Sequence, residues 1–490
     1  MVRPAKYIGA CVLATLIVGG VVVGWRVATH RPTADADHPM ADTVVLLVHG
    51  LTFDRERGGA SWGQPSPGPH GGYAWDGMIG YLLKRGFRFG GTVRLRGSKV
   101  EFHNAYGKEG SDRANLFVVE FSPDANAATL ASRARELADC IRAVRDRTHC
   151  DKVRIVAHSA GGLVSRAYLQ ELDAPGGSHV DRLITIGTPH LGSRLCTFFA
   201  FLLGKRAECL TPESPEVQSL NSRPFPSDVA FAAIVIRAKA ERAQARIAQR
   251  FEQFDKARGT IAATKALADE LGLGLAVEKP AELVDAIVQI VKVDLLGQAI
   301  TYDKMDGSYA ERLPLDFRCG GDQVVHVTSQ NLRLTGSAAA YEKATGRPIH
   351  YILVRATPPP DSSLLKGQTV HGSELSQPEV QEWVARLLLD DGKFWSGMGP
   401  AEREAWIQRQ VEQSAFSNLE FSAGHSSVTL GEVRLVKEQG HRRTYRISGR
   451  YVPVASDQEV RAEGTLEIEL DDFARIVACD PQIEESTPPP

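Results

Sequence analysis

The chain has 490 residues, of which 43% are hydrophobic and 24% charged, as in an ordinary globular protein. Its length allows two or three domains, or one large domain with insertions. The formal net charge of -2 and the lack of a basic stripe argue against nucleic-acid binding, so neutral or apolar partners are expected.

The N-terminal segment, residues 1–31, has the character of a membrane anchor or an export signal. Residues 7–25 carry no charge, and as a helix rising about 1.5 Å per residue they would nearly cross a hydrocarbon core of about 30 Å. A cleaved signal peptide, with the small residues at 34–36 as a rather distant cleavage site, is the main alternative, and a buried core helix is the third. With an anchor or a cleaved signal peptide, the rest of the chain is exported to the periplasmic or extracellular side. Residues 32–42 would then be a polar tether.

Six cysteines lie beyond this segment, and an even number in an exported chain suits disulfide bonds. In chain order they are Cys140, Cys150, Cys196, Cys209, Cys319 and Cys479. The first two and the middle two are the local pairings, which leaves the last two for each other. Six free, buried thiols are the alternative. The chain has no C-x-x-C or His-rich spacing, so no metal site is predicted.

From residue 43 onward, strand and helix patterns alternate. The apolar run at 43–48 predicts the first strand, because strands buried on both faces of a parallel sheet are apolar throughout. The further elements predicted are, in chain order, a helix at 75–84, a strand at 115–121, a helix at 125–147, strands at 153–158, 181–189 and 229–237, sheet structure at 323–328 and 349–355, and a helix at 378–389. This rhythm indicates an α/β domain with a mostly parallel sheet, which we place at residues 43–395.

Two stretches interrupt the rhythm, residues 194–228 and 238–312. The first contains a compact apolar patch at 195–203, and the second is mainly helical in pattern. Both fall where an α/β enzyme carries a cap, beside the C-terminal edge of its sheet. We therefore predict helical cap insertions that cover an apolar acyl site, with ordinary core as the alternative.

The sequence changes character beyond the α/β domain. Short runs between 427 and 470 predict antiparallel strands, so residues 412–480 are assigned to a small β-rich appendage without a chemical motif. Residues 481–490 end in prolines and are predicted to be a disordered tail.

A strand–serine–helix junction has the spacing of a nucleophile elbow. Residues 153–158 predict a buried strand, and helical spacing resumes directly after Ser159. Ala157 and Gly161, two before and two after the serine, are small enough for a close approach of strand and helix, although glycine is usual at the first of these positions. Such a turn holds the serine hydroxyl at a helix N-terminus, which favours an anion. A buried serine in an ordinary βα turn is the alternative.

A serine hydroxyl is a weak nucleophile, so it needs a base, and the base needs an acid to orient it. Asp322 lies in a glycine turn at an element boundary, and His371 lies in a loop after the strand at 349–355. We predict that these two residues complete a triad with Ser159. The weaker acids are Asp303, Asp306 and Asp316, and the weaker histidines are His326, His350, His425 and His441.

An attacked carbonyl also needs two N–H groups to hold its oxyanion. The amide of Ala160 begins the helix after the serine. The second amide is predicted to be that of Leu51, in the loop after the first strand, where Gly50 lets the backbone turn. His49 and His158 are then predicted to be structural, packing beneath the site.

Five motifs occur in order along the chain. They are Val-His-Gly-Leu at 48–51, Ala-His-Ser-Ala-Gly-Gly at 157–162, Gly-Thr-Pro-His-Leu-Gly-Ser at 187–193, Gly-Asp-Gln-Val-Val at 321–325, and His371 before Pro-Glu-Val at 378–380. Together they resemble the bacterial lipase and esterase branch of the α/β-hydrolase superfamily, and the related inositol-deacylase-like lipases that act on glycolipid anchors.

This resemblance covers residues 43–390 and implies an α/β-hydrolase fold that hydrolyses carboxylic esters. Ser159 would be the nucleophile, His371 the base and Asp322 the orienting acid. Gln323 and His326 depart from the pattern, because many relatives have glycine and proline there.

The sequence thus predicts an exported, membrane-tethered serine hydrolase that cleaves esters of acyl chains. Its partners would be a lipid or small ester and, through residues 1–31, a membrane. No cofactor is needed, and a calcium ion enters only by family analogy, without a visible ligand set. An acyltransferase or thioesterase with the same triad is the alternative among enzymes, and a catalytically silent binding module is the alternative outside them.

Overall fold

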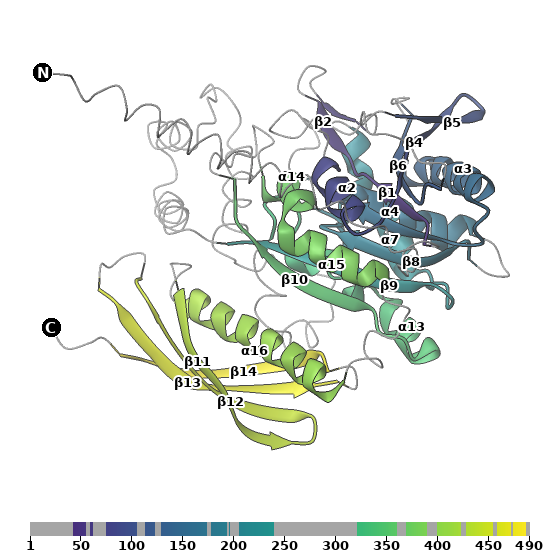
Figure 1. Cartoon of the computed structure of the whole chain (residues 1–490). Coiled ribbons are helices and arrows are strands. Elements are labelled where there is room, and N and C mark those ends of the chain that lie inside the picture. The colour runs from purple at the N-terminus through teal and green to yellow at the C-terminus, as the bar shows by residue number, and fades with distance from the viewer. Residues whose placement is uncertain are drawn as a thin grey trace, which may run out of the picture. The chain divides into compact units, whose positions relative to one another are not determined.

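In the computed structural model of the chain, an eight-stranded sheet forms the centre of the domain that contains residues 45–356 (Figure 1). The structure describes residues 43–54, 59–61, 75–104, 113–122, 129–173, 178–193, 196, 205–239, 321–359, 369–389, 399–422, 428–453, 458–471 and 474–486. The strands of this sheet are β1 (Val45–Val48), β4 (Phe89–Arg96), β5 (Lys99–His103), β6 (Leu116–Glu120), β7 (Val153–His158), β8 (Val180–Ile186), β9 (Ala230–Ala238) and β10 (His350–Ala356). A separate hairpin pairs β2 (Thr52–Asp54) with β3 (Gly59–Ser61).

The strand order is β10-β9-β8-β7-β1-β6-β4-β5, and every pairing is parallel except that of β4 with β5. The central strand β1 is fully buried on both faces, as its apolar run predicts. In sheets of this kind, ligands bind outside the carboxyl ends of the parallel strands.

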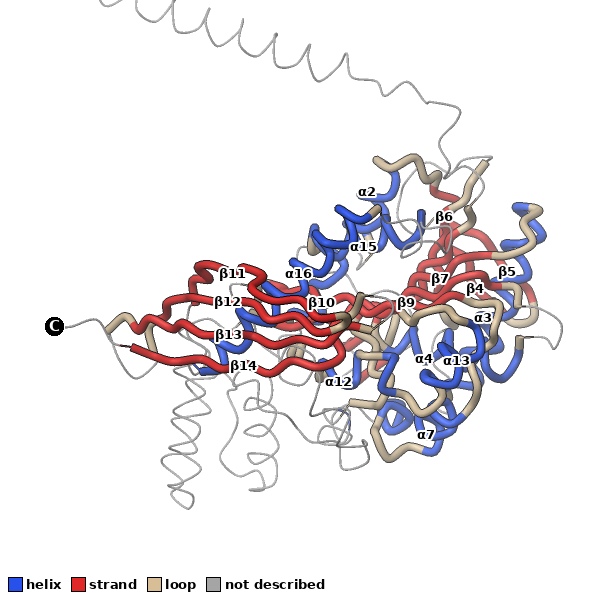
Figure 2. The backbone as a smooth tube through the Cα atoms, turned by 90° about the horizontal axis from the view of Figure 1, so that it is seen from below, coloured by secondary structure: helices blue, strands red, loops and turns tan. Residues whose placement is uncertain are grey.

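Helices cover both faces of the sheet (Figure 2). On one face lie α2 (Asp76–Leu83) and α15 (Pro378–Leu389), which contact each other. On the other lie α3 (Leu130–Thr148), α4 (Ala160–Ala167), α7 (Pro215–Ser222) and α13 (Ala338–Thr345). Their apolar side chains and those of the strands form the main core. The predicted α/β-hydrolase fold is therefore confirmed.

Two parts of the sheet differ from the prediction. The strands β4 and β5 were not predicted, because β4 contains two glycines and β5 lies at the edge with charged residues alternating along it. Residues 323–326 were predicted as sheet but form a loop, closed by a bridge between Gly321 and His326, and the short helix α12 (Val327–Gln330) follows. The backbone N–H groups of this loop bind the Asp322 carboxylate instead of a neighbouring strand.

The described part of the first predicted cap belongs to the body of the domain. It contains a 3₁₀ turn, η2 (Lys205–Leu210), and α7, which contacts α4. Val217 and Leu220 of α7 are buried in the main core, so the alternative of ordinary core is correct for this part. Residues 240–312 of the second predicted cap lie outside the described residues.

The C-terminal part is an antiparallel sheet of β11 (Val428–Gln439), β12 (Arg442–Tyr451), β13 (Val460–Leu470) and β14 (Ile476–Ser486), in that order. It is preceded by α16 (Pro400–Ser422), which the sequence reasoning missed. The helix has apolar residues every fourth position, at Ile407, Val411, Ala415 and Leu419, and all four are buried, as in an amphipathic helix.

The last strand corrects the prediction of a disordered tail from residue 481. Residues 481–486 continue β14 and pair with β13. Pro481 fits there because β14 is an edge strand, in which a missing N–H need not break a ladder. Residues 487–490 lie outside the described residues.

Contacts join this sheet and its helix to the α/β domain. The hydroxyl of Tyr351 donates to the carbonyl of Ile476 at 3.0 Å, and Gln413 of α16 donates to the carbonyl of Leu353 at 3.2 Å. Arg475 is buried and pairs with Glu342 of α13 at 2.8 Å. The bond from Gln413 satisfies a backbone carbonyl of β10, the edge strand of the eight-stranded sheet, where backbone groups would otherwise be unpaired.

The five cysteines among the described residues are free thiols, so neither local disulfide predicted from the sequence is present. Cys140 points into the core, with its Sγ 3.9 Å from the carbonyl oxygen of Val93, whereas Cys150 follows the end of α3 and accepts a bond from Thr148. Burial raises the pKa of Cys196 to about 12, so this thiol stays protonated. Cys319 lies outside the described residues.

Within the part of the chain that the structure describes, no helix has the length and apolar character needed to cross a bilayer. The predicted anchor at residues 7–25 lies outside that part.

Candidate active site

The turn between β7 and α4 places Ser159 in a strained conformation. Its φ of 55° and ψ of -135° lie outside the regions that non-glycine residues ordinarily occupy. Gly161 faces the end of β1, where an added Cβ would lie 2.6 Å from the carbonyl oxygen of His49. Strand and helix therefore meet as closely as the small residues of the motif predict, with the serine at the corner.

The imidazole of His371 lies between Ser159 and Asp322. His371 belongs to the short helix α14 (Val370–Ser373), its Nε2 lies 2.8 Å from Ser159 Oγ, and its Nδ1 lies 2.8 Å from Asp322 Oδ2. All three side chains are buried. The three residues predicted from separate motifs are thus hydrogen-bonded in the order that proton transfer from the serine requires.

The carboxylate of Asp322 is fixed by four hydrogen bonds. Its Oδ1 accepts from the backbone N–H groups of Val324 and Val325 at 2.8 and 2.6 Å. Its Oδ2 accepts from Gln330 Nε2 at 3.1 Å, besides the bond with His371. Gln330 is itself buried and bonds to both backbone polar groups of Ile236, so it ties the acid to β9. Sequence reasoning missed Gln330, since it belongs to no motif.

The acid loop also holds the histidine loop. The N–H of His371 donates to the Asp322 carbonyl at 3.0 Å, and the N–H of Val370 donates to Gln323 Oε1 at 2.8 Å. Gln323 has a φ of 76°, in the left-handed region that favours glycine. Its side chain provides a bond that a glycine lacks.

Glu374, which follows α14 in the 3₁₀ turn η5 (Glu374–Ser376), is a second carboxylate at the site. Its Oε2 lies 3.0 Å from His158 Nε2, and its Oε1 lies 3.4 Å from His371 Nδ1. The rings of His158 and His371 are 4.8 Å apart between centroids. His158, predicted to pack beneath the site, thus lies beside the base. Glu374 lies about one helical turn after His371 in the sequence, and this spacing could have predicted that it lies near the base.

Charges around the base favour its protonated form. Burial would lower the pKa of His371, but the carboxylates of Asp322 and Glu374 raise it well above its usual value. Burial raises the pKa of Asp322 to about 7 against the attraction of His371. Burial would also raise the pKa of Glu374, but His371 and the hydrogen bond with His158 lower it to about 2. An ionised carboxylate therefore remains beside the imidazolium as the pair titrates.

The predicted oxyanion donors lie at the same corner. Ala160 begins α4, where the first N–H groups of a helix have no intrahelical partner. Gly50 lies against the elbow, since an added Cβ would come 2.6 Å from Ser159 Cβ and 2.8 Å from the Ala160 nitrogen. Leu51 follows directly in the chain and packs on the main core. The loop after β1 is thus next to the nucleophile.

The weaker candidates do not reach the serine in the described residues. His326 bonds to Thr328 at 2.7 Å, and His350 is the first residue of β10. Asp303, Asp306, Asp316 and His425 lie outside the described residues.

Within the described residues, one group has the spacing of a metal site, His158, His371 and Glu374, whose ligand atoms lie within 4.8 Å of one another. Both nitrogens of His371 are already hydrogen-bonded to Ser159 and Asp322, so this group is better described as a hydrogen-bonded network.

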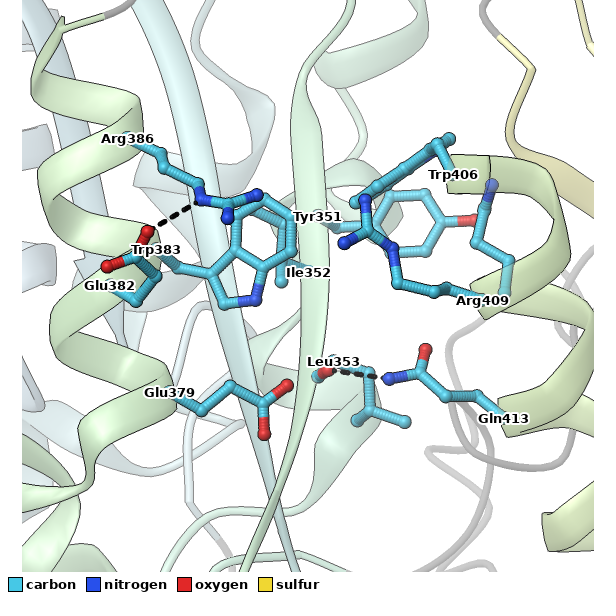
Figure 3. A pocket seen from close by; sticks show the side chains of 11 residues that line it. Tyr351, Ile352, Leu353, Glu379, Glu382, Trp383, Arg386, Trp406, Arg409 and Gln413 are labelled. Atoms are coloured by element: carbon cyan, nitrogen blue, oxygen red, sulfur yellow. Dashed lines mark hydrogen bonds and ion pairs between the residues drawn. The ribbon is translucent and has the colours of Figure 1, made fainter. Parts of the chain in front are cut away.

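A cavity of about 210 Å³ lies between β10, α15 and α16 (Figure 3). Trp383 and Trp406 line it with ring centroids 5.4 Å apart, and the guanidinium of Arg409 lies near both rings. None of the residues that line it is Ser159, Asp322 or His371, so this cavity is separate from the site around the serine.

The parallel sheet and the serine at the strand–helix corner have the architecture of an α/β-hydrolase fold. More particularly, residues 96–201, which include Ser159, match the family model described as PGAP1-like alpha/beta domain. The resemblance predicted from the motifs is thereby confirmed. No curated protein sequence matches the chain.

Several solved structures are similar in fold. A Listeria innocua gene product is 14% identical, with 74% of this chain and 96% of that chain covered and a TM-score of 0.34. The Bacillus licheniformis lipase BlEst2 is 14% identical, with 71% and 92% covered and a TM-score of 0.35. EstA from Clostridium botulinum is 14% identical, with 71% and 86% covered and a TM-score of 0.35. At these values the likenesses carry no argument about activity.

Proposed function

We propose that this protein is a carboxylic ester hydrolase that acts through Ser159, His371 and Asp322. The observation that supports the proposal most is the pair of 2.8 Å contacts that His371 makes, one from each ring nitrogen, with Ser159 Oγ and Asp322 Oδ2. The strained serine at a helix N-terminus supports it independently.

Acylation begins when Ser159 Oγ attacks the ester carbonyl carbon. A bond forms between Oγ and this carbon, the hydroxyl proton moves to His371 Nε2, and the carbonyl π electrons move onto oxygen. The amides of Leu51 and Ala160 hold this oxyanion, and each such donor is worth about 3–4 kcal/mol in the transition state. Asp322 stabilises the imidazolium without itself taking the proton.

Collapse of the tetrahedral intermediate completes acylation. The bond to the alcohol oxygen breaks, and this oxygen takes the proton from His371, which leaves an acyl-enzyme on Ser159. His371 then removes a proton from water as it attacks the acyl carbon. The Ser159 oxygen leaves with that proton, and a carboxylic acid is released. No external cofactor enters this balance.

The substrate class we propose is an ester of an acyl chain, presented at a membrane. The apolar patch at 195–203 and the uncharged segment at 7–25 motivate this part of the proposal. Residues 7–25 would tether the enzyme, with the hydrolase domain on the periplasmic or extracellular side.

A fluorophosphonate probe tests the nucleophile. We expect it to label the wild-type chain and not the Ser159→Ala variant, and equal labelling of both would contradict the proposal. Hydrolysis of p-nitrophenyl esters of increasing acyl length, with and without detergent micelles, then separates a lipase from a small-ester esterase. Faster acyl transfer to an added alcohol than to water would instead identify an acyltransferase.

A further inference from the structure

His49 follows β1 directly and makes one specific hydrogen bond. Its Nδ1 lies 2.8 Å from the carbonyl oxygen of Gly50, and the side chain is buried. A carbonyl oxygen can only accept, so Nδ1 must carry the hydrogen. The ring packs edge-on against Phe121 at 5.3 Å, and among the described residues its Nε2 has no hydrogen-bond partner. The bond to Gly50 is therefore the polar contact that fixes this ring.

The surroundings keep His49 neutral. Burial lowers its pKa to about 4, and the charges of Arg133 and His158 act in the same direction, against the hydrogen bond to Gly50. The ring is thus uncharged near neutral pH, with its hydrogen on Nδ1.

The carbonyl that His49 holds belongs to the peptide whose N–H is that of Leu51. A peptide unit is planar, and the described chain has no cis peptide bond, so the Gly50 carbonyl and the Leu51 N–H point in opposite directions. A donor that fixes the carbonyl therefore fixes the direction of the N–H. Gly50 lies against Ser159 and Ala160, so this peptide is next to the proposed nucleophile.

We propose that His49 is a positioning residue for the oxyanion hole: by holding the Gly50 carbonyl, it aims the Leu51 N–H at the oxyanion. This inference rests on the proposed ester hydrolysis, and it assigns a task to a histidine that the sequence motif predicts only as packing. His49 does not touch the substrate or exchange a proton with it.

The test uses two variants of similar shape. In His49→Asn, the side-chain amide can place an N–H where Nδ1 was, whereas in His49→Leu no donor remains. The substrates are one ester and its thionoester, in which sulfur replaces the carbonyl oxygen. Sulfur accepts hydrogen bonds poorly, so an intact oxyanion hole favours the ester. The ratio of the two kcat/KM values does not depend on how much of a preparation is folded.

We expect His49→Leu to lower kcat for the ester about 10- to 100-fold, with little change in KM. This decrease is no larger than the one caused by removing an oxyanion-hole donor outright. The ratio of ester to thionoester should fall with it. His49→Asn should retain most of the wild-type ratio.

Two results would overturn the inference while leaving ester hydrolysis in place. One is a wild-type ratio in His49→Leu, and the other is equal ratios in the Asn and Leu variants. A wild-type chain that hydrolyses neither substrate would instead contradict the proposed function, and the assignment of His49 with it.

Discussion

Gly187 leaves room for the carboxylate of Glu374. A Cβ added to Gly187 would lie 2.2 Å from Glu374 Oε2, and the glycine also has a φ of 57°, in the left-handed region. Gly187 directly follows β8 and belongs to the Gly-Thr-Pro motif. A larger residue at this position would collide with the Glu374 side chain. The glycine therefore lets Glu374 reach His158 and His371.

The variant Gly187→Ala should be destabilised by about 1–3 kcal/mol, because the new methyl group meets the carboxylate and the backbone is strained. Urea unfolding measures the difference. In a Glu374→Ala background the carboxylate is gone, so the cost of Gly187→Ala should shrink to that of the backbone alone. Equal costs in both backgrounds would contradict the contact.

Removing the charge of Glu374 should move the pH dependence of hydrolysis. His371 acts as a base only when neutral, so kcat/KM should rise with pH through its pKa. The carboxylates of Asp322 and Glu374 raise that pKa. Glu374→Gln removes one negative charge, so the rise should occur at lower pH than in the wild type. A pH profile of kcat/KM between 5 and 9 decides the matter, and an unchanged or upward shift would refute the argument.

Asp322→Asn should lower kcat about 10⁴-fold, because an amide cannot hold the Nδ1–H tautomer of His371 or stabilise the imidazolium. Steady-state kinetics on the preferred ester measure the loss. Glu374→Gln serves as the matched control, since its oxygen lies at 3.4 Å from the same nitrogen rather than 2.8 Å. A larger loss for Glu374→Gln would make Glu374 the principal acid.

Gln323 should matter through its side chain rather than its backbone. Gln323→Gly relieves the left-handed conformation but removes the acceptor of the Val370 N–H, a bond worth about 1 kcal/mol. We expect little change in the free energy of unfolding and a lower kcat, because the histidine loop loses a contact. Gln323→Glu keeps an acceptor and should lose less activity. An unchanged or higher kcat in the glycine variant would contradict this role of the Gln323 side chain.

Acid should destabilise the fold through buried neutral histidines. Burial lowers the pKa of His49 to about 4, and burial and Arg166 lower that of His190 well below its usual value. Between pH 6.5 and 4 the unfolded chain binds protons that the folded chain does not, so the free energy of unfolding decreases as the pH is lowered. Each such histidine contributes up to about 1.4 kcal/mol per pH unit. Urea unfolding across this range checks the slope, which should be smaller in His49→Leu.

The α/β order, the elbow and the three triad positions could be predicted because each has a local physical cause. An apolar run followed by a serine and a helix reports a buried strand and a sharp turn, wherever it lies in the fold. The glycine turn around Asp322 and the loop at His371 carry similar local signals.

Elements whose stability comes from distant partners were missed. The strand β14 has no strong pattern of its own and forms because β13 pairs with it. The helix α16 has a clear apolar stripe, but the residues that pack against this stripe belong to strands that follow it in the chain. Gln330 and Glu374 look like ordinary polar residues until their burial and contacts are known.

By itself, the amino-acid sequence determined the alternation of strands and helices along the chain and singled out Ser159, Asp322 and His371 as the predicted triad. Only the tertiary structure decided that His371, 212 positions from Ser159 and 49 from Asp322, touches both, and that a second carboxylate and a second histidine lie beside it. The reason is that side-chain patterns report local conformation, whereas distances between separate loops depend on how the whole sheet packs.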